Sequence, residues 1–274
     1  MEEEPVTDVT SGGSSFGHQQ RVEEFVVNGK LSLDLRTASG DITVNPSADG
    51  RCVVRMIAQG ADAERRLSEV EVSFDSDSQA LRVATMPNSS LRSGRRLFGT
   101  WRDVDLVVLV PLGTALSAKT ASGDVGATVE LVRATVSSAS GDIRLATVTE
   151  RARANTASGD VTMDTVHGAG TVRSASGDIE ISNASGEVDV RTVSGDVSVG
   201  VDGSLAASVK SISGNVVVRV AKGLVVEVNA TTLSGNLASE IDLDQGSSND
   251  PVSNGQRVSV RISTVSGNAQ IERK

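Results

Sequence analysis

Apolar and polar residues alternate in short runs along the second half of the chain, and the runs return in the same register. Two apolar columns, two residues apart, follow a recurring Ser-Gly-Asp motif: Val125, Ile143, Val161, Ile179 and Val197, then Ala127, Leu145, Met163, Ile181 and Val199. Residues two apart share one face of a strand, whereas a helix would show apolar intervals of three and four residues. Each run therefore predicts a short strand with one buried face.

A second apolar run precedes each motif. Its residue pairs include Ala152 and Ala154, Gly170 and Val172, and Val188 and Val190. Two strands and two corners in every 18 residues are typical of a solenoid whose successive coils pair about 4.8 Å apart. The predicted fold is all-β: a single-chain parallel β-solenoid with about 18 residues per coil.

The motif itself predicts a structural corner. Its strict copies are Ser122, Gly123 and Asp124; Ser140, Gly141 and Asp142; Ser158, Gly159 and Asp160; Ser176, Gly177 and Asp178; Ser194, Gly195 and Asp196. Glycine reaches backbone angles that other residues reach only at a cost, and serine and aspartate oxygens satisfy turn amides. Later copies carry Asn215, Asn236 and Asn268 at the acid position, which keeps the turn and discards the charge. Threonines and serines before the corners predict a hydrogen-bonded ladder of hydroxyls.

A bound cation such as calcium is the alternative function of the aspartates. Carboxylates stacked about 4.8 Å apart repel by about 0.9 kcal/mol per pair in water, and a cation would relieve this repulsion. Calcium-binding repeats-in-toxin rolls, however, need glycine-rich nonapeptides with ligands converging from both corners. Here one corner carries the acid, which favours turn geometry. We predict no cofactor and no metal, and the sequence leaves the cation status of the ladder open.

Three regions differ in composition. Residues 1–21 are acidic and then rich in serine and glycine, which predicts a disordered tail. Residues 22–118 predict a β-rich N-terminal cap with the first coils and one short helix over Ala61–Ser68, because Asp62 precedes Arg65 and Arg66 as the helix dipole favours. Residues 119–274 predict the solenoid, with a flexible loop at 244–256.

Three further predictions concern the N-terminal region. Asn28-Gly29 between the apolar runs 22–27 and 31–35 predicts a β-hairpin with a tight turn. Residues 81–84 and 104–110 predict strands. The segment between these strands gathers arginine and aromatic residues in an acidic chain that contains few aromatics: Arg92, Arg95, Arg96, Phe98 and Trp101. Arginine and tryptophan are favoured at binding hot spots, so this segment predicts either a partner-binding loop or a cap over the solenoid end.

The net charge and the N-terminal sequence limit which partners and which cellular location we expect for the protein. The net charge of −9 opposes binding to nucleic acid, which depends on neutralising phosphates with lysine and arginine. Cys52 is the single cysteine, no run of apolar residues is long enough for a membrane span, and the acidic N-terminus is unlike a secretory signal. These features predict a cytoplasmic protein with no direct membrane span.

We find no set of residues in the sequence with the types and spacing of a catalytic site, so we predict that the protein is not an enzyme. His18 and His167 are the two histidines, and neither has a nucleophile or a partner base at a matching spacing. The repeated aspartates stand in identical settings, which suits them poorly to the split acid and base roles of catalysis.

Beyond these residues, three segments resemble a known family: FVVNGKLSLDLRTASGDITV, VDLVVLVPLGTALSAKTASGDV and the run of SGD and SGN corners. From about Val22 to the C-terminus the chain resembles the bacterial toast-rack β-strand-repeat family, also called "putative adhesin", a domain of unknown function. The resemblance implies a β-solenoid without established enzymatic activity, linked to membrane or envelope stress systems and proposed as an assembly scaffold. It carries over no functional residue, because the family offers no defined site.

Three functions stay open. The leading hypothesis is a non-enzymatic scaffold or protein-interaction module that binds one or more proteins, and that associates with a membrane only peripherally, through a partner. An exported adhesive or carbohydrate-binding surface module is the second. A glycan-acting β-helix enzyme is the third hypothesis. It is disfavoured because such enzymes use a single, non-repeated cluster of charged residues in a cleft, and we find no such cluster in this sequence.

Overall fold

The computed structural model describes residues 7–8, 18–85, 104–203, 206–240 and 257–274. They divide into two compact units, residues 1–142 and 143–274. Among the described residues, nearly all regular structure in both units is β-strand, and one helix of six residues occurs. The predicted all-β class with a single short helix is confirmed.

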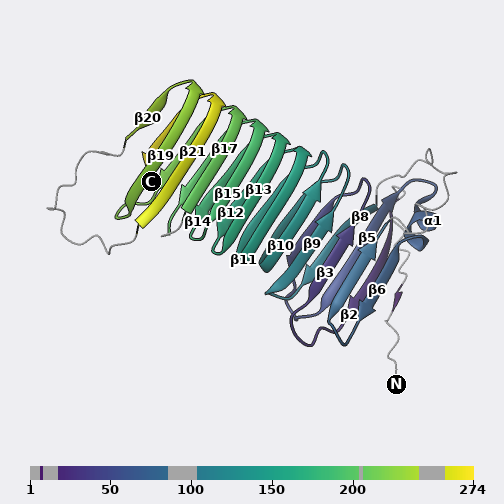
Figure 1. The fold of residues 1–274 in the computed structure, drawn as a ribbon. Coiled ribbons are helices and arrows are strands. Elements are labelled where there is room, and N and C mark those ends of the chain that lie inside the picture. Colours follow the sequence, from purple (N-terminus) through teal and green to yellow (C-terminus); the bar gives the residue numbers. More distant parts are fainter. Residues whose placement is uncertain (1–6, 9–17, 86–103, 204–205, 241–256) are drawn as a thin grey trace. The chain divides into compact units, whose positions relative to one another are not determined.

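In the second unit, strands that follow the corners form one ladder and strands that precede them form another (Figure 1). The post-corner ladder contains, in spatial order, β12 (Val161–Val166), β14 (Ile179–Ala184), β16 (Val197–Val201), β18 (Val216–Val220), β22 (Ala269–Arg273) and β20 (Leu237–Ser239). The pre-corner ladder contains β13 (Ala169–Ser176), β15 (Val188–Ser194), β17 (Ala206–Ser213), β21 (Arg257–Ser266) and β19 (Val225–Ser234). The long strand β11 (Ile143–Ser158) joins both ladders, since it pairs with β12 and then with β13.

The last strands of the second unit are not in sequence order. β21 lies between β17 and β19, and β22 lies between β18 and β20. The final segment of the chain is therefore inserted between two earlier coils, and β19 and β20 form the outer edge. All of these pairs are parallel.

The first unit has the same two ladders, joined by β10 (Val125–Ser138). One ladder contains β1 (Thr7–Asp8), β2 (His18–Phe25), β5 (Cys52–Gln59), β8 (Val104–Val110) and β4 (Ile42–Pro46), followed by β10. The other contains β6 (Glu71–Asp75), β7 (Ala80–Ala84), β3 (Ser32–Arg36) and β9 (Thr114–Lys119), followed by β10. Antiparallel pairs occur at β1, β2, β5 and β6, whereas the remaining pairs are parallel.

Helix α1 (Ala63–Ser68) covers one side of β2 and β5. Ala63 and Leu67 are buried, and the Arg21 guanidinium donates hydrogen bonds to the carbonyl oxygens of Leu67 at 3.0 Å and Val70 at 3.1 Å. These bonds tie β2 to the last turn of the helix and to Val70, which follows the helix C-cap. The helix predicted from the sequence is thus confirmed.

The core consists of the predicted apolar columns. Val161 and Met163, which stand two residues apart after a corner, have 0% of their surface exposed, and so do Ala152 and Ala154 of the preceding run. The predicted columns are confirmed.

The predicted hairpin at Asn28-Gly29 is wrong. β2 pairs antiparallel with β5 over eight residues, and β3 pairs with β7 and β9. Separating the two strands gives β2 a longer partner and gives β3 two parallel neighbours, so more backbone groups are paired than in a hairpin. The backbone N–H of Asn28 donates to Gln79 Oε1 at 2.8 Å, which fixes the connection in place of a turn.

The predicted disordered tail also needs a correction, because β2 begins at His18, inside the range 1–21. No helix in the described part of the chain is long and apolar enough to cross a membrane. The predicted loop at 244–256 lies outside the described residues.

Candidate functional site

The aspartates of the corners are joined to one another by hydrogen bonds from backbone to side chain. In the first unit, the backbone N–H of Asp124 donates to Asp41 Oδ1 at 2.9 Å, and that of Asp142 donates to Asp124 Oδ1 at 2.9 Å. In the second unit, the backbone N–H groups of Asp178 and Asp196 donate in the same way at 2.8 Å to the corner one coil earlier. Each of these carboxylates therefore satisfies a turn amide of the neighbouring coil.

Asparagine continues this ladder without the charge. The backbone N–H of Asn215 donates to Asp196 Oδ1 at 2.7 Å. That of Asn268 donates to Asn215 Oδ1 at 3.3 Å, and that of Asn236 donates to Asn268 Oδ1 at 3.1 Å. An amide oxygen accepts the bond as a carboxylate oxygen does, so the ladder needs the oxygen and not the negative charge.

Glycine is required where the corners stack. Gly177 and Gly195 have φ angles of +124° and +118°, and a Cβ at Gly195 would lie 2.2 Å from the Gly177 carbonyl oxygen. A Cβ at Gly123, whose φ is not in the left-handed region, would still lie 2.1 Å from the Gly40 carbonyl oxygen. Close approach of neighbouring corners, in addition to backbone conformation, excludes a side chain.

Buried hydroxyls bond within their own corner, in two patterns. Thr120 Oγ1 and Ser138 Oγ accept from the backbone N–H groups of Gly123 and Gly141 at 2.9 and 2.8 Å. In the second unit Thr192 Oγ1 instead donates to the Ser194 carbonyl oxygen at 3.0 Å. These hydroxyls therefore stabilise individual turns, whereas Thr232 Oγ1, at the equivalent position of β19, donates to the Gly267 carbonyl oxygen of the neighbouring coil at 3.5 Å.

The described residues offer little reactive chemistry. Among them, no group of three or more His, Cys, Asp or Glu side chains is placed to hold a metal ion. Cys52 is buried, and burial raises the pKa of its thiol to about 12, so the group is a thiol at neutral pH. His167 is exposed in the turn after β12, and His18 is exposed at the start of β2.

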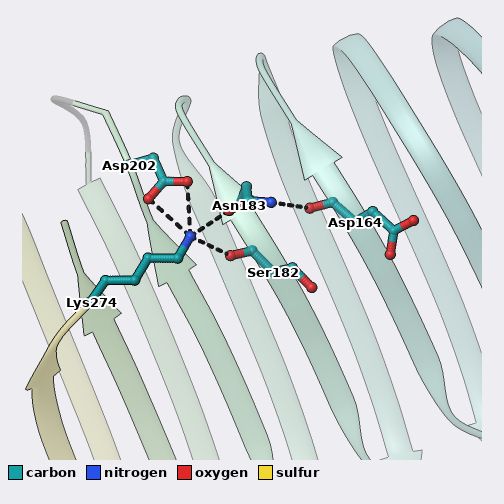
Figure 2. A network of polar contacts seen from close by, with 5 residues as sticks. All are labelled: Asp164, Ser182, Asn183, Asp202 and Lys274. Carbon is teal, nitrogen blue, oxygen red and sulfur yellow. Dashed lines mark hydrogen bonds and ion pairs between the residues drawn. The ribbon is translucent and has the colours of Figure 1, made fainter.

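One polar network that the sequence does not signal fixes the end of β22 (Figure 2). Lys274 Nζ donates to both Asp202 carboxylate oxygens at 3.0 Å, to the Ser182 carbonyl oxygen at 3.1 Å and to Asn183 Oδ1. Asn183 Nδ2 in turn donates to the Asp164 carbonyl oxygen at 3.2 Å. The Lys274 side chain thus ties β14 and the residue after β16 to the end of the last strand, and Asn183 extends the network to β12, so the network forms a clamp rather than a reactive site.

The predicted partner-binding residues lie outside the described residues. They are Arg92, Arg95, Arg96, Phe98 and Trp101, in the segment between β7 and β8. Their role stays a prediction.

The corner ladder in both units leads to the comparison with known proteins. The family model described as Toastrack DUF4097 matches residues 32–272. The chain belongs to this family. The match begins at the first strand of the corner architecture, β3, and ends within β22. No curated protein matches this Toastrack chain.

Solved structures are similar to this Toastrack chain at low sequence identity. A "putative adhesin" from Bacteroides fragilis NCTC 9343 is 12% identical over 92% of this chain and 97% of its own, with a TM-score of 0.53. A "putative adhesin" from Parabacteroides distasonis ATCC 8503 is 10% identical over 92% and 97%, with a TM-score of 0.40. A "putative cell adhesion protein" from Clostridium sporogenes ATCC 15579 is 14% identical over 94% and 100%, with a TM-score of 0.31.

The predicted cytoplasmic location is contradicted by these comparisons. The Bacteroides fragilis structure carries the name of a "putative adhesin", and adhesion takes place at the cell surface. The prediction depended on the absence of an export signal and of a membrane-spanning segment. Neither absence bears on where a protein with this fold acts.

Proposed function

We propose that this Toastrack protein is a non-enzymatic binding module at the cell surface. It is a parallel β-solenoid with about 18 residues per coil, whose corners hold the coils together and whose outward faces contact the partner. Strand register supports this coil length, because Val161 pairs with Ile179 and Ile179 pairs with Val197. Repeats stacked in this way create extended surfaces, which suit binding.

The uniform use of the corner carboxylates carries the proposal. Asp41, Asp124, Asp160, Asp178 and Asp196 each accept the backbone N–H of a neighbouring corner through Oδ1. Acid and base catalysis needs two groups whose environments differ. Because these carboxylates all make the same kind of hydrogen bond to a neighbouring corner, they support a structural role. The outward faces of the strands are then left for contact with other molecules.

Two features guide the identity of the partner. The name of the Bacteroides fragilis structure supports adhesion, and the resemblance to the family implies a scaffold linked to envelope stress. The segment with Arg95, Arg96 and Trp101 is a second candidate contact, since these residue types are favoured at binding hot spots. Replacing these three residues is expected to weaken a partner complex while the melting temperature stays the same.

Binding to intact cells tests the proposal. The purified, labelled protein is incubated with cells of the bacterium that encodes it, and bound protein and released soluble material are both measured. We expect saturable binding with no release of glycan or lipid fragments. Release of fragments that stops when a single corner aspartate is changed to asparagine would identify an enzyme. Absence of saturable binding would refute a surface-binding role.

A further inference from the structure

One outward position of the corner motif changes character along the second unit. The residue before the corner serine is Ala157 and Ala175 in the first coils. On the next four strands of the pre-corner ladder it is, in spatial order, Val193, Ile212, Val265 and Leu233. These four side chains are 49%, 52%, 46% and 83% exposed. We call them the apolar row.

Three of the four corners beside the apolar row also lose their negative charge, while the corner after Val193 keeps Asp196. The strands with alanine precede Asp160 and Asp178, whereas Ile212, Val265 and Leu233 precede Asn215, Asn268 and Asn236. Aspartate and asparagine make the same backbone hydrogen bond in this ladder, so the fold does not require the change. Aliphatic side chains and neutral corners together give the part of this edge at Ile212, Val265 and Leu233 an uncharged, apolar surface.

A row of cations overlaps the apolar row on the same face, since Arg191 and Lys210 stand behind Val193 and Ile212. Arg173, Arg191 and Lys210 are partners in register on β13, β15 and β17, and all three are exposed. We call them the basic row. Each stands two residues before the position of the apolar row, which is about 7 Å along the strand. Like charges on neighbouring strands repel, and an anionic partner would relieve this repulsion.

Acidic side chains compensate this charge only in part. Arg191 forms an ion pair with Asp189 at 3.0 Å, whereas no acidic partner of Arg173 or Lys210 lies among the described residues. Arg261 on β21 adds a further exposed cation to the face, opposite Ser208. The net charge of the chain is −9, so this concentration of cations is local.

We propose that the apolar row and the basic row together bind the surface of an anionic lipid bilayer. The aliphatic side chains would enter the boundary between headgroups and acyl chains, and the cations behind them would reach the phosphates. An acidic polysaccharide would complement the cations, but it would leave the exposed aliphatic side chains without a partner. This inference rests on the proposed function, because it names the partner of one face of the binding module.

Flotation with lipid vesicles tests the inference. The full chain is mixed with vesicles of phosphatidylcholine and phosphatidylglycerol, or of phosphatidylcholine alone, and the floated protein is measured. We expect binding to the anionic vesicles only. Each cation near an anionic surface contributes about 1 kcal/mol, so R173Q/R191Q/K210Q is expected to weaken binding on the order of 100-fold. I212T/V265T/L233T is expected to weaken it by roughly tenfold or more.

Matched variants control for exposure and charge. Val26→Thr with Leu112→Thr removes two exposed aliphatic side chains of the first unit, which are 63% and 70% exposed. Lys30→Gln, Arg55→Gln and Lys222→Gln remove three exposed cations from outside the two rows. Both control variants are expected to bind anionic vesicles as the unchanged protein does, and equal losses in these variants would overturn the assignment of the two rows.

Other outcomes separate this inference from the proposed function. Binding to soluble polygalacturonate that survives I212T/V265T/L233T would assign the face to an acidic polysaccharide. A dimer that this variant abolishes, without any vesicle binding, would assign the apolar row to a second copy of the chain. Saturable binding to cells without binding to vesicles would overturn the lipid proposal and leave the proposed function standing.

Discussion

The backbone N–H of Asn215 donates to Oδ1 of Asp196 at 2.7 Å, and this bond joins the last aspartate corner to the first asparagine corner. On one side of it, the ladder is built from carboxylates, and on the other side from amides. The bond is made in both parts. The corner therefore has a structural requirement, a side-chain oxygen at this position, that is independent of charge.

The first prediction follows from this requirement. Asp178→Ala removes the acceptor of the Asp196 N–H bond and is expected to lower the free energy of unfolding by about 1 kcal/mol. Asp178→Asn keeps an acceptor oxygen and is expected to change it by less than about 0.5 kcal/mol. Urea unfolding followed by circular dichroism measures both. Equal losses in the two variants would show that the charge, and not the bond, stabilises the corner.

Corner glycines provide a second prediction. Gly195→Ala places a Cβ 2.2 Å from the Gly177 carbonyl oxygen at a φ of +118°, and it is expected to cost about 3 kcal/mol. Gly126→Ala in β10 is the control, because a Cβ there meets no atom within 4 Å. It is expected to stabilise the chain by about 0.5 kcal/mol. A Gly195→Ala variant as stable as the unchanged protein would contradict the close stacking of the corners.

Two buried threonines at the same corner position allow a third prediction. Thr192 Oγ1 donates to the Ser194 carbonyl oxygen, whereas Thr156 Oγ1 is buried without a hydrogen-bond partner among the described residues. Thr192→Val is expected to lower the free energy of unfolding by about 1 kcal/mol, and Thr156→Val is expected to leave it unchanged or raise it. Chemical unfolding of both variants side by side distinguishes them. The reverse order would contradict the two hydrogen-bond patterns.

The buried thiol allows a fourth prediction. Burial raises the pKa of Cys52 from an ordinary value of 9.0 to about 12, so the folded chain keeps a proton that the unfolded chain loses in this range. Its contribution to stability is present below pH 9 and is lost as the pH rises from about 9 to about 12. We expect the fall in unfolding free energy over this range to be smaller in Cys52→Ala. The same slope in both proteins would show that the thiol is accessible in the folded state.

Alkylation of Cys52 is an independent check on its burial. At neutral pH, iodoacetamide is expected to modify the folded protein on the order of 100-fold more slowly than the protein in urea, because reaction requires opening of the first unit. Comparable rates in the two conditions would contradict a buried Cys52.

Local periodicity was sufficient to predict the strands and their buried faces. Val161 and Met163 stand two residues apart, and this spacing alone places them on one face. Helix α1 was predicted from its charge order for the same reason, since the determining residues are neighbours in sequence. The asparagine corners already indicated that charge is dispensable.

Pairing between distant strands could not be predicted in the same way. The three SGN corners have nearly identical sequences, so nothing local orders them as Asn215, Asn268 and Asn236. The β-hairpin predicted from Asn28-Gly29 was wrong because β2 pairs with a longer partner strand, β5. The clamp made by Lys274 joins residues 72 or more positions apart. Such a contact occurs once and produces no periodic pattern in the sequence, so it could not be predicted.

The central claim is that the corners build the fold and the outward faces bind. It is tested most directly by changing Asp124, Asp142, Asp160, Asp178 and Asp196 together to asparagine and measuring saturable binding to cells. The five changes move the net charge from −9 to −4. We predict a folded protein that binds as tightly as the unchanged protein or more tightly. A folded variant that no longer binds would contradict the claim by placing the functional site at the corners, and a variant that fails to fold would contradict the equivalence of the two side-chain oxygens.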